Sequence, residues 1–278
     1  MMKEEKNKDY LSSLLRISVY GAAAITSIAL LLLIGYILLK GIPHITPELF
    51  AWEYNSENVS LLPALLNTLF MVALALCIAA PLGIFAAIYL VEYAKRGNKL
   101  VEFVRLTAET LSGIPSIVYG LFGMLFFVGA LGWELSLLSG SFTVAIMILP
   151  IIMRTTEEAL KSVPDSYREG SFGLGAGALR TVFRIVLPSA MPGILAGVIL
   201  ATGRIVGETA ALIYTAGTVA KLADSVFSST RTLAVHMYML ANEGLHIEQA
   251  YATAVILLII VIAINWVSGT IAGRIKKG

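Results

Sequence analysis

The sequence has a single cysteine, Cys77, which lies inside an apolar run, so an intrachain disulfide is excluded. Charge is also scarce: Asp, Glu, Lys and Arg make up 14% of the 278 residues, against about 25% in an ordinary soluble domain. Hydrophobic residues make up 58%. Because one water-soluble core has no room for so much apolar surface, the composition predicts a protein whose solvent is lipid.

Groups that carry enzyme chemistry are sparse as well. The three histidines, His44, His236 and His246, are too dispersed for a metal site, and we interpret them as surface residues with satisfied hydrogen bonds. No convergent nucleophile or metal cluster is recognisable, so the sequence disfavours a membrane enzyme and predicts no metal or cofactor bound by the chain.

Long apolar runs, in contrast, are frequent, and a transmembrane helix needs about 20 such residues. Six stretches meet or approach that length: 17–39, 62–89, 110–131, 142–152, 190–216 and 250–272. The fourth is short, so we expect it to extend into 139–141 or 153–156. The first is longer than the apolar segment of a cleaved signal peptide and is predicted to be retained. The fold class is therefore an all-α integral membrane protein with six transmembrane helices.

The lysines and arginines indicate the orientation of these helices. Six spans place both termini and the loops after the second and fourth spans on one side. All but four of the cations fall on that side, the exceptions being Lys40, Lys221 and Arg231 opposite and Arg204 inside the fifth span. By the positive-inside rule the cation-rich side is the cytoplasm.

This orientation divides the chain into four parts. We predict a cytoplasmic tail at 1–16, a first helix with an extracytoplasmic loop at 17–61, a core of spans at 62–272 and a second cytoplasmic tail at 273–278.

The cytoplasmic connection at 154–188 is the longest, and a loop of that length usually carries structure or function. Ser166 and Glu169 fit a capping box at the start of a helix. The glycines within 173–177 end this helix, and a second helix is predicted over 178–186. The glycines follow no strand and no P-loop lysine accompanies them, so we predict no ATP site in this chain.

The same loop resembles the coupling loop of ABC importer permeases. Their pattern is Glu-Ala-Ala, three residues, Gly, nine residues, Ile, one residue and Leu-Pro. The matching residues are Glu169, Gly170, Ser171, Gly175, Ile185, Leu187 and Pro188, with Gly-Ser replacing Ala-Ala. The resemblance implies that this segment, with Arg168 beside it, docks in a groove of a separate ATPase subunit. An ordinary interfacial helix with coincidental spacing is the alternative.

Arg204 and Glu208 stand about midway along the fifth predicted span. An arginine at a helix centre costs about 2.5 to 3.5 kcal/mol, so it calls for a reason. The four-residue spacing puts both side chains on one helix face, together with the small residues Gly197 and Ala201. Two interpretations remain open: a structural ion pair, or a gate in which the carboxylate orients a guanidinium that binds tetrahedral oxyanions.

Glycine and proline patterns add expectations about packing. The pairs Gly193/Gly197 and Gly203/Gly207 have the small-xxx-small spacing of close helix contacts. Pro81, Pro115 and Pro150 lie inside the second, third and fourth predicted spans, where they interrupt the helices. Kinked helices around a translocation path and simple packing features are both compatible with these prolines.

Three segments resemble the A-type permease subunits of bacterial phosphate ABC importers (PstA), within the binding-protein-dependent transport permease family. They are 203–210, with the pattern Arg-x-x-Gly-Glu-Thr-Ala, 112–122 and 232–238. The resemblance covers most of the chain beyond the first span. It implies a type I ABC importer permease fold in the bacterial inner membrane, with the anion passing Arg204, Glu208 and Thr209.

The resemblance also implies the partners. These are a homologous permease subunit, two copies of an ATPase that uses ATP and Mg, and an extracytoplasmic phosphate-binding protein; self-pairing of this chain remains open. A permease for sulfate or molybdate is the nearest alternative. A secondary transporter is the alternative of another class, but the inverted repeats it predicts are not seen.

Overall fold

The computed structural model describes residues 2–95 and 97–275. Over those residues the regular secondary structure consists of helices only, joined by turns and loops. The long helices are α1 (Met2–Gly41), α2 (Leu62–Ile88), α5 (Leu137–Lys161), α8 (Leu187–Val206) and α11 (Ile247–Ile275). The shorter ones are α3 (Lys99–Ser112), α4 (Ser116–Gly123), α6 (Asp165–Gly173), α7 (Ala178–Thr181), α9 (Ala210–Thr215) and α10 (Leu233–Glu243). The π-helical segments η3 (Tyr89–Tyr93), η4 (Met124–Ala130) and η5 (Val182–Val186) extend α2, α4 and α7, and the 3-10 turns η1 (Ile42–His44) and η2 (Pro47–Phe50) follow α1.

Within the described residues, five helices are long and apolar enough to cross a membrane, and a bent pair raises the number to six. The five are Leu15–His44, Leu62–Tyr93, Leu137–Lys161, Ala178–Val206 and Ile247–Val267. The fourth predicted span extends in both directions, to 137 and to 161. The predicted tail at 1–16 is helical from Met2, and α11 includes 273–275, while 276–278 lie outside the described residues.

The third predicted span, 110–131, is interrupted, and the break predicted at Pro115 is confirmed. Helices α3 and α4–η4 meet at an angle of 102° across 113–115. Pro115 has no N–H and disfavours the α conformation in the residue before it, and together with Gly113 it breaks the helix here. The Tyr119 hydroxyl on α4 donates to the Leu111 carbonyl on α3 (2.8 Å) and fastens the two halves together. Pro81 and Pro150, in contrast, lie inside the unbroken helices α2 and α5.

The fifth predicted span, 190–216, is displaced at both ends. The helix runs unbroken from Ala178 through Leu187-Pro188 to Val206, so the predicted helix at 178–186 and the span are one element. The π-helical turn η5 directly before Pro188 accommodates the missing proline N–H. Gly207 then ends the helix, and the short α9 follows.

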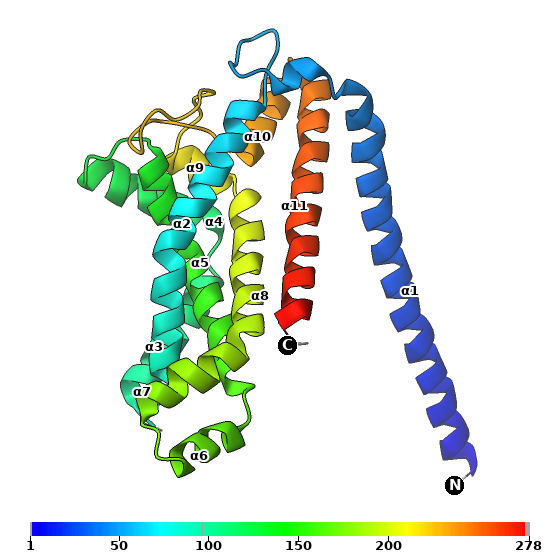
Figure 1. The fold of residues 1–278 in the computed structure, drawn as a ribbon. Helices are drawn as coiled ribbons and strands as arrows, with labels where there is room; N and C mark the ends of the chain where they lie inside the picture. Colours follow the sequence, from blue (N-terminus) through cyan, green and yellow to red (C-terminus); the bar gives the residue numbers. More distant parts are fainter. Residues whose placement is uncertain (1, 96, 276–278) are drawn as a thin grey trace.

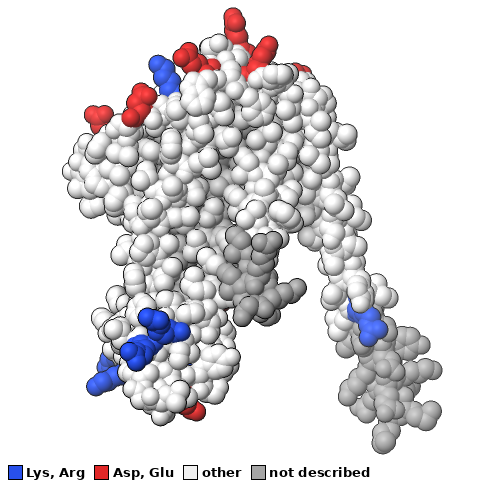
Figure 2. All heavy atoms as spheres, in the orientation of Figure 1, with Lys and Arg blue, Asp and Glu red and all other residues white. Residues whose placement is uncertain are grey.

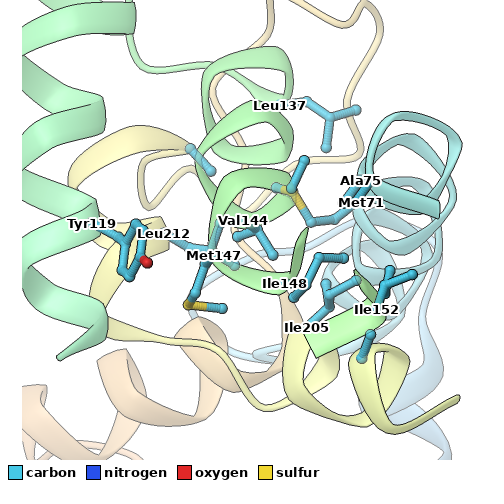
Figure 3. Close-up of a cluster of buried hydrophobic side chains, with 14 of the residues drawn as sticks. Met71, Ala75, Tyr119, Leu137, Val144, Met147, Ile148, Ile152, Ile205 and Leu212 are labelled. Carbon is cyan, nitrogen blue, oxygen red and sulfur yellow. The ribbon is translucent and has the colours of Figure 1, made fainter. Parts of the chain in front are cut away.

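Helix α5 stands at the centre of the bundle (Figure 1), and 67% of its most apolar stretch is buried inside the protein. Met71 of α2, Ile148 of α5 and Ile205 of α8 pack in one cluster with Leu212 of α9 (Figure 3). Helix α1, by contrast, leans away from the bundle and contacts α11, where Gly41 lies against the Tyr251 backbone. Protein surrounds α5, whereas the exposed apolar surface of α1 suits lipid or a partner subunit.

The bundle has two distinct ends, the α6 end and the opposite α10 end (Figure 1). In the face shown in Figure 2, Lys and Arg gather at the α6 end, whereas Asp and Glu gather at the α10 end. The exposed carboxylates of the α10 end include Glu53, Glu57 and Asp224.

Candidate functional site

Two interrupted helical spans meet inside the bundle. Helix α4, after the break at 113–115, packs against α9, after the break at 207–209. Their backbones approach closely because Gly120 faces the Ala211 backbone and Gly123 lies between Thr143 and Thr215, where a Cβ atom would clash. Membrane proteins tolerate such interruptions where protein or a polar cavity satisfies the freed backbone groups.

Arg204 lies in the last turn of α8, beside these interruptions. Its side chain is exposed in this single chain and forms no ion pair with the described residues. Its charge lies close enough to the Tyr119 hydroxyl for an electrostatic interaction. A guanidinium in this position offers its full set of donors to a ligand or a partner.

The predicted pairing of Arg204 with Glu208 is not found. Because α8 ends at Val206, Glu208 lies in the break and the two residues no longer share a helix face. The Glu208 side chain is 7% exposed, and its Oε1 accepts the Ala211 N–H at 3.0 Å, which caps α9. Thr209 follows as the N-cap residue, but its side chain makes no capping bond.

The small-residue face of α8 is packed rather than open. Gly193 lies against Ala159 and Gly197 against Thr155, so the first predicted glycine pair does form a close contact, with α5. Ala201 is fully buried as well. The second pair, Gly203 and Gly207, meets no other helix at contact distance. The face at Gly193 and Gly197 is therefore closed by α5.

Instead, a cleft of about 460 Å³ opens between α3, α5 and α8. Ser112, Pro150 and Leu200 line its apolar part, and charged residues line the part toward the α6 end. Leu200 is 60% exposed and precedes Arg204 by one helical turn, so both side chains lie on the same face of α8. The cleft thus runs from the neighbourhood of Arg204 toward the α6 end.

A charged junction stands at that end of the cleft. Glu157 of α5 accepts from Arg105 of α3 (2.7 Å) and from Lys161 (2.6 Å). The Glu157 side chain is 10% exposed. Since both cations reach the same oxygen, the junction ties α3 to α5 near the mouth of the cleft.

Helix α6 forms the base of the α6 end, where the sequence predicts a docking helix. Its N-cap is Pro164 and no side chain caps it, so the predicted capping box of Ser166 and Glu169 is wrong. The predicted loop 154–188 is also shorter than expected, because α5 continues to Lys161 and the next helix begins at Ala178. Only the segment 162–177 connects the two long helices.

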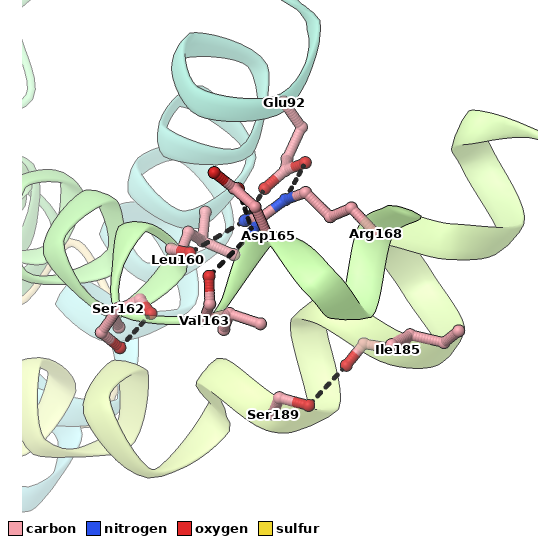
Figure 4. Close-up of polar contacts among 9 residues, drawn as sticks. Glu92, Leu160, Ser162, Val163, Asp165, Arg168, Ile185 and Ser189 are labelled. Carbon is pink, nitrogen blue, oxygen red and sulfur yellow. Dashed lines mark hydrogen bonds and ion pairs between the residues drawn. The ribbon is translucent and has the colours of Figure 1, made fainter. Parts of the chain in front are cut away.

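Arg168 fastens α6 to the end of α2 (Figure 4). Its Nε and Nη2 donate to the two carboxylate oxygens of Glu92 at 3.2 and 2.7 Å, and both side chains are nearly buried. The guanidinium also donates to the carbonyls of Val163 (2.8 Å) and Leu160 (3.0 Å). The hydrogen bond to Glu92 raises the pKa of Arg168 above its usual value. Arg168 is turned inward and holds α6 in place.

A second bond fastens the other side of α6. The Ser171 and Thr181 hydroxyls, both buried, lie 2.8 Å apart and join α6 to α7. Gly175, with φ +82°, makes the left-handed turn between the helices, a conformation that favours glycine. A groove of about 500 Å³ beside this turn is lined by Gly175, Arg184 and Ile185.

The remaining residues of the predicted coupling pattern are divided between surface and interior. Glu169, Gly170 and Pro188 are exposed, whereas Leu187 is half-buried. Large apolar side chains surround them on the surface: Tyr167, Phe172, Leu174 and Leu179, of which Leu174 is 91% exposed. Such an exposed apolar group at the end of a bundle is typical of a contact surface for another protein.

Several functional residues were not found from the sequence. Glu92 falls just past the second predicted span, where a charge signals a helix end but not its partner. Tyr119 and Asn67 are polar residues inside apolar runs, and that signal alone marks them for attention. His236 was interpreted as a surface residue but is fully buried. Within the described residues, no group of three or more His, Cys, Asp or Glu side chains could hold a metal ion.

The chain resembles known transport proteins in sequence and structure. Residues 79–277 match the family described as "Binding-protein-dependent transport system inner membrane component". Over 274 residues the chain is 32% identical to "Probable ABC transporter permease protein YqgI" of Bacillus subtilis (strain 168), covering 92% of both chains. Over 241 residues it is 33% identical to "Phosphate transport system permease protein PstA" of Xylella fastidiosa (strain 9a5c), covering 85% of this chain and 84% of that protein.

The structural match gives the fold. A crystal structure of a bacterial alginate ABC transporter in complex with an alginate pentasaccharide-bound periplasmic protein contains a chain that superposes with a TM-score of 0.66. The match covers 94% of this chain and 96% of that one at 16% identity. The chain therefore adopts the fold of type I ABC importer permeases, as the sequence predicted.

Proposed function

We propose, on the premise that this chain belongs to the family of binding-protein-dependent transport system inner membrane components, that it forms half of an import pathway for inorganic phosphate. As a family member it is a multi-pass permease subunit of an ABC importer. The observation that carries the proposal is Arg204: an arginine at an interrupted span, without an internal carboxylate, beside an open cleft. The likeness to phosphate permeases supports the choice of substrate.

The guanidinium of Arg204 suits phosphate because its planar donors can bind two oxygens of one tetrahedral anion. Glu208, engaged in capping α9, leaves these donors free. In this proposal the anion passes Arg204 and Thr209 and leaves through the cleft between α3, α5 and α8. Glu208 supports the break that exposes Arg204.

Import in this proposal is driven by ATP hydrolysis in two copies of a separate ATPase subunit, with Mg, and this chain is not itself an enzyme. A homologous permease subunit completes the pathway, and an extracytoplasmic binding protein delivers phosphate at the α10 end. The α6 end and both termini face the cytoplasm, in keeping with the distribution of lysines and arginines. The core at 62–272 carries the pathway, and 17–61 is peripheral.

The unbroken helix from Ala178 to Val206 gives the docking surface a mechanical route to Arg204. From Ala178 to Arg204 the chain advances 26 residues, which at 1.5 Å each correspond to about 39 Å. The ATPase would contact the segment from Glu169 to Gly175, at the end of α6 and the turn after it. The bonds of Arg168 and Ser171 would pass its movement to α2 and α7. Movement at the α6 end thereby tilts the segment that carries Arg204.

Uptake measured in competition tests the substrate. Cells that express the complete importer should take up radiolabelled phosphate, and excess unlabelled phosphate should abolish that uptake while sulfate and molybdate leave it unchanged. Inhibition by sulfate or molybdate at equal concentration would instead assign the importer to another oxyanion. Uptake that continues with a Walker-A lysine variant of the ATPase would reject the ATP-driven mechanism.

A further inference from the structure

A second arginine without a carboxylate lies at the α10 end. Arg231 precedes α10 and is 4% exposed. The backbone N–H of Arg231 donates to the Val219 carbonyl (3.0 Å), and the backbone carbonyl of Arg231 accepts from the side-chain amide of Asn67 (3.4 Å). Asn67, fully buried on α2, also donates to the Lys221 carbonyl (2.8 Å) and accepts the Ala223 N–H (3.0 Å). The loop that carries Arg231 is therefore fixed before any ligand arrives.

The guanidinium of Arg231 contacts the ring of Tyr54, but the donors along one of its edges have no hydrogen-bond partner in the described chain. Its Cζ lies 4.7 Å from the centroid of the Tyr54 ring, a cation–π contact. Its Nε and Nη2 are buried and donate to none of the described residues, and no described carboxylate pairs with it. A buried charge is normally paired, so this edge calls for an anion.

Two neighbours of Arg231 are also buried without a hydrogen-bond partner in the described chain: the Thr232 hydroxyl and both ring nitrogens of His236. Burial, together with the charge of Arg231, lowers the pKa of His236 to about 3. The imidazole is therefore neutral near pH 7 and offers one N–H donor. The Val59 backbone lies near the ring but outside hydrogen-bond geometry. Thr232 is the N-cap of α10, whose first N–H groups favour negative charge.

Arg168 shows in the same molecule what this edge of a guanidinium binds. Its Nε and Nη2, the two atoms left free in Arg231, hold two oxygens of one carboxylate. We propose that Arg231, Thr232 and His236 form a second anion-binding site, which takes a small oxyanion such as inorganic phosphate bidentately on the Nε and Nη2 of Arg231. Its place at the α10 end separates it from Arg204, and its argument does not depend on phosphate being the transported substrate.

Tyr54, whose ring contacts Arg231, also lines a cavity at the α10 end. The ring of Tyr54 borders a cavity of about 360 Å³ whose lining also includes Lys221, Glu53 and Asp224. Lys221 attracts an approaching anion, whereas the two carboxylates repel it. We therefore expect weaker binding of a dianion than the donors alone would give.

Equilibrium binding of radiolabelled phosphate tests the proposal on the assembled importer in lipid nanodiscs without nucleotide. Arg204→Gln in this chain removes the pathway arginine, and the complex should still bind phosphate. Adding Arg231→Lys should weaken that binding at least tenfold, because an ammonium keeps the positive charge but lacks the two parallel N–H donors of a guanidinium. Adding Glu57→Gln, at an exposed carboxylate of the α10 end that does not line the cavity, is the control and should change the affinity less than twofold.

Three outcomes would overturn the site: no phosphate bound by the Arg204→Gln complex, equal affinity with and without Arg231→Lys, or chloride competing as well as sulfate. Loss of binding when the substrate-binding protein is added would also overturn it, because a carboxylate of that protein would then be the occupant. Should Arg231→Lys fail to assemble, the Arg204→Gln complex provides the test alone. Phosphate must raise its thermal unfolding temperature, and no rise rejects the proposal.

Discussion

Arg168 and Arg204 lie in different parts of the molecule and use the same side chain in opposite ways. Arg168, at the α6 end, is 15% exposed and holds both oxygens of Glu92. Arg204, in the last turn of α8, is exposed in this single chain and has no ion pair among the described residues. The difference shows that an internal carboxylate turns a guanidinium into a structural clamp, whereas its absence leaves the donors to a ligand. Arg231 is a third case, buried like Arg168 but unpaired like Arg204.

Breaking the clamp should have the largest effect on stability. Glu92→Ala leaves the nearly buried Arg168 with only the exposed carboxylate of Asp165 (3.2 Å), and losing one partner of a buried pair costs about 3 to 5 kcal/mol. Thermal unfolding of the purified complex should show the loss. Glu158→Ala is the matched control, since its pair with Arg154 is exposed and contributes about 0.5 kcal/mol. Equal effects of the two substitutions would contradict the role of Arg168.

Removing the free arginine should abolish transport without affecting assembly. Arg204→Ala should lower phosphate uptake at least about 100-fold, equivalent to about 2.7 kcal/mol, because no other described cation lies in or next to the breaks at 113–115 and 207–209. Co-purification with the ATPase and the unfolding temperature should stay near wild type. Lys221→Ala, at an exposed cation of the α10 end, is the control and should retain most uptake. Normal uptake by a well-expressed Arg204→Ala strain would refute the pathway role.

Acid should destabilise the α10 end through His236. The folded pKa is about 3 against about 6.5 in the unfolded chain, so between these values the unfolded state binds more protons. Stability is therefore full above about pH 6.5 and falls as the pH drops. At pH 5 the loss is about 2 kcal/mol, from 1.5 pH units at 1.36 kcal/mol each.

The measurement is the difference in unfolding temperature between pH 7.5 and pH 5. His236→Gln should reduce that difference, whatever its effect at pH 7.5. An unchanged pH dependence in the variant would mean that other groups govern the acid response.

The docking turn should respond to a side chain at Gly175. A residue other than glycine at φ +82° costs about 1 to 2 kcal/mol, and no atom lies close enough to add a clash. Gly175→Glu should therefore leave the permease folded but weaken co-purification of the ATPase and stop uptake. Gly170→Ala, on the exposed side of α6 with open space around it, should have little effect. Intact ATPase binding by Gly175→Glu would count against docking at this turn.

The smallest effect is expected at Glu208. Gln in place of Glu208 keeps an oxygen for the Ala211 N–H and loses a charge at a helix start, so we expect a cost of about 0.3 to 1 kcal/mol. Phosphate uptake should stay within about threefold of wild type. A loss as large as that of Arg204→Ala would restore the idea that the carboxylate orients Arg204.

The sequence analysis identified most of the helices and the interruption at Pro115, but it expected interruptions at Pro81 and Pro150, where the helices continue, and missed the break at 207–209. Apolar runs of about 20 residues locate spans because lipid satisfies no backbone group, so the first, second, fourth and sixth spans were predicted well. Pro115 signals the break in the run at 110–131, but only the Tyr119–Leu111 bond and the packing on α9 fix the direction of the bend. Arg204 was found because a charge in an apolar run is conspicuous. Its lack of a carboxylate was not predicted, because i, i+4 spacing implies contact only where the helix continues.

The sequence alone determined that this chain lies in a membrane, crosses it with helices, concentrates cations at one end and carries a coupling pattern. Each of these features is local, since it depends on composition and spacing within a few helical turns. Only the tertiary structure decided that Arg168 is a clamp, that Glu208 caps α9 and that Arg231 and His236 are buried without partners. The reason is that pairing and burial depend on elements far apart in the chain, such as Glu92 with Arg168 and Asn67 with Arg231, whose meeting no short pattern encodes.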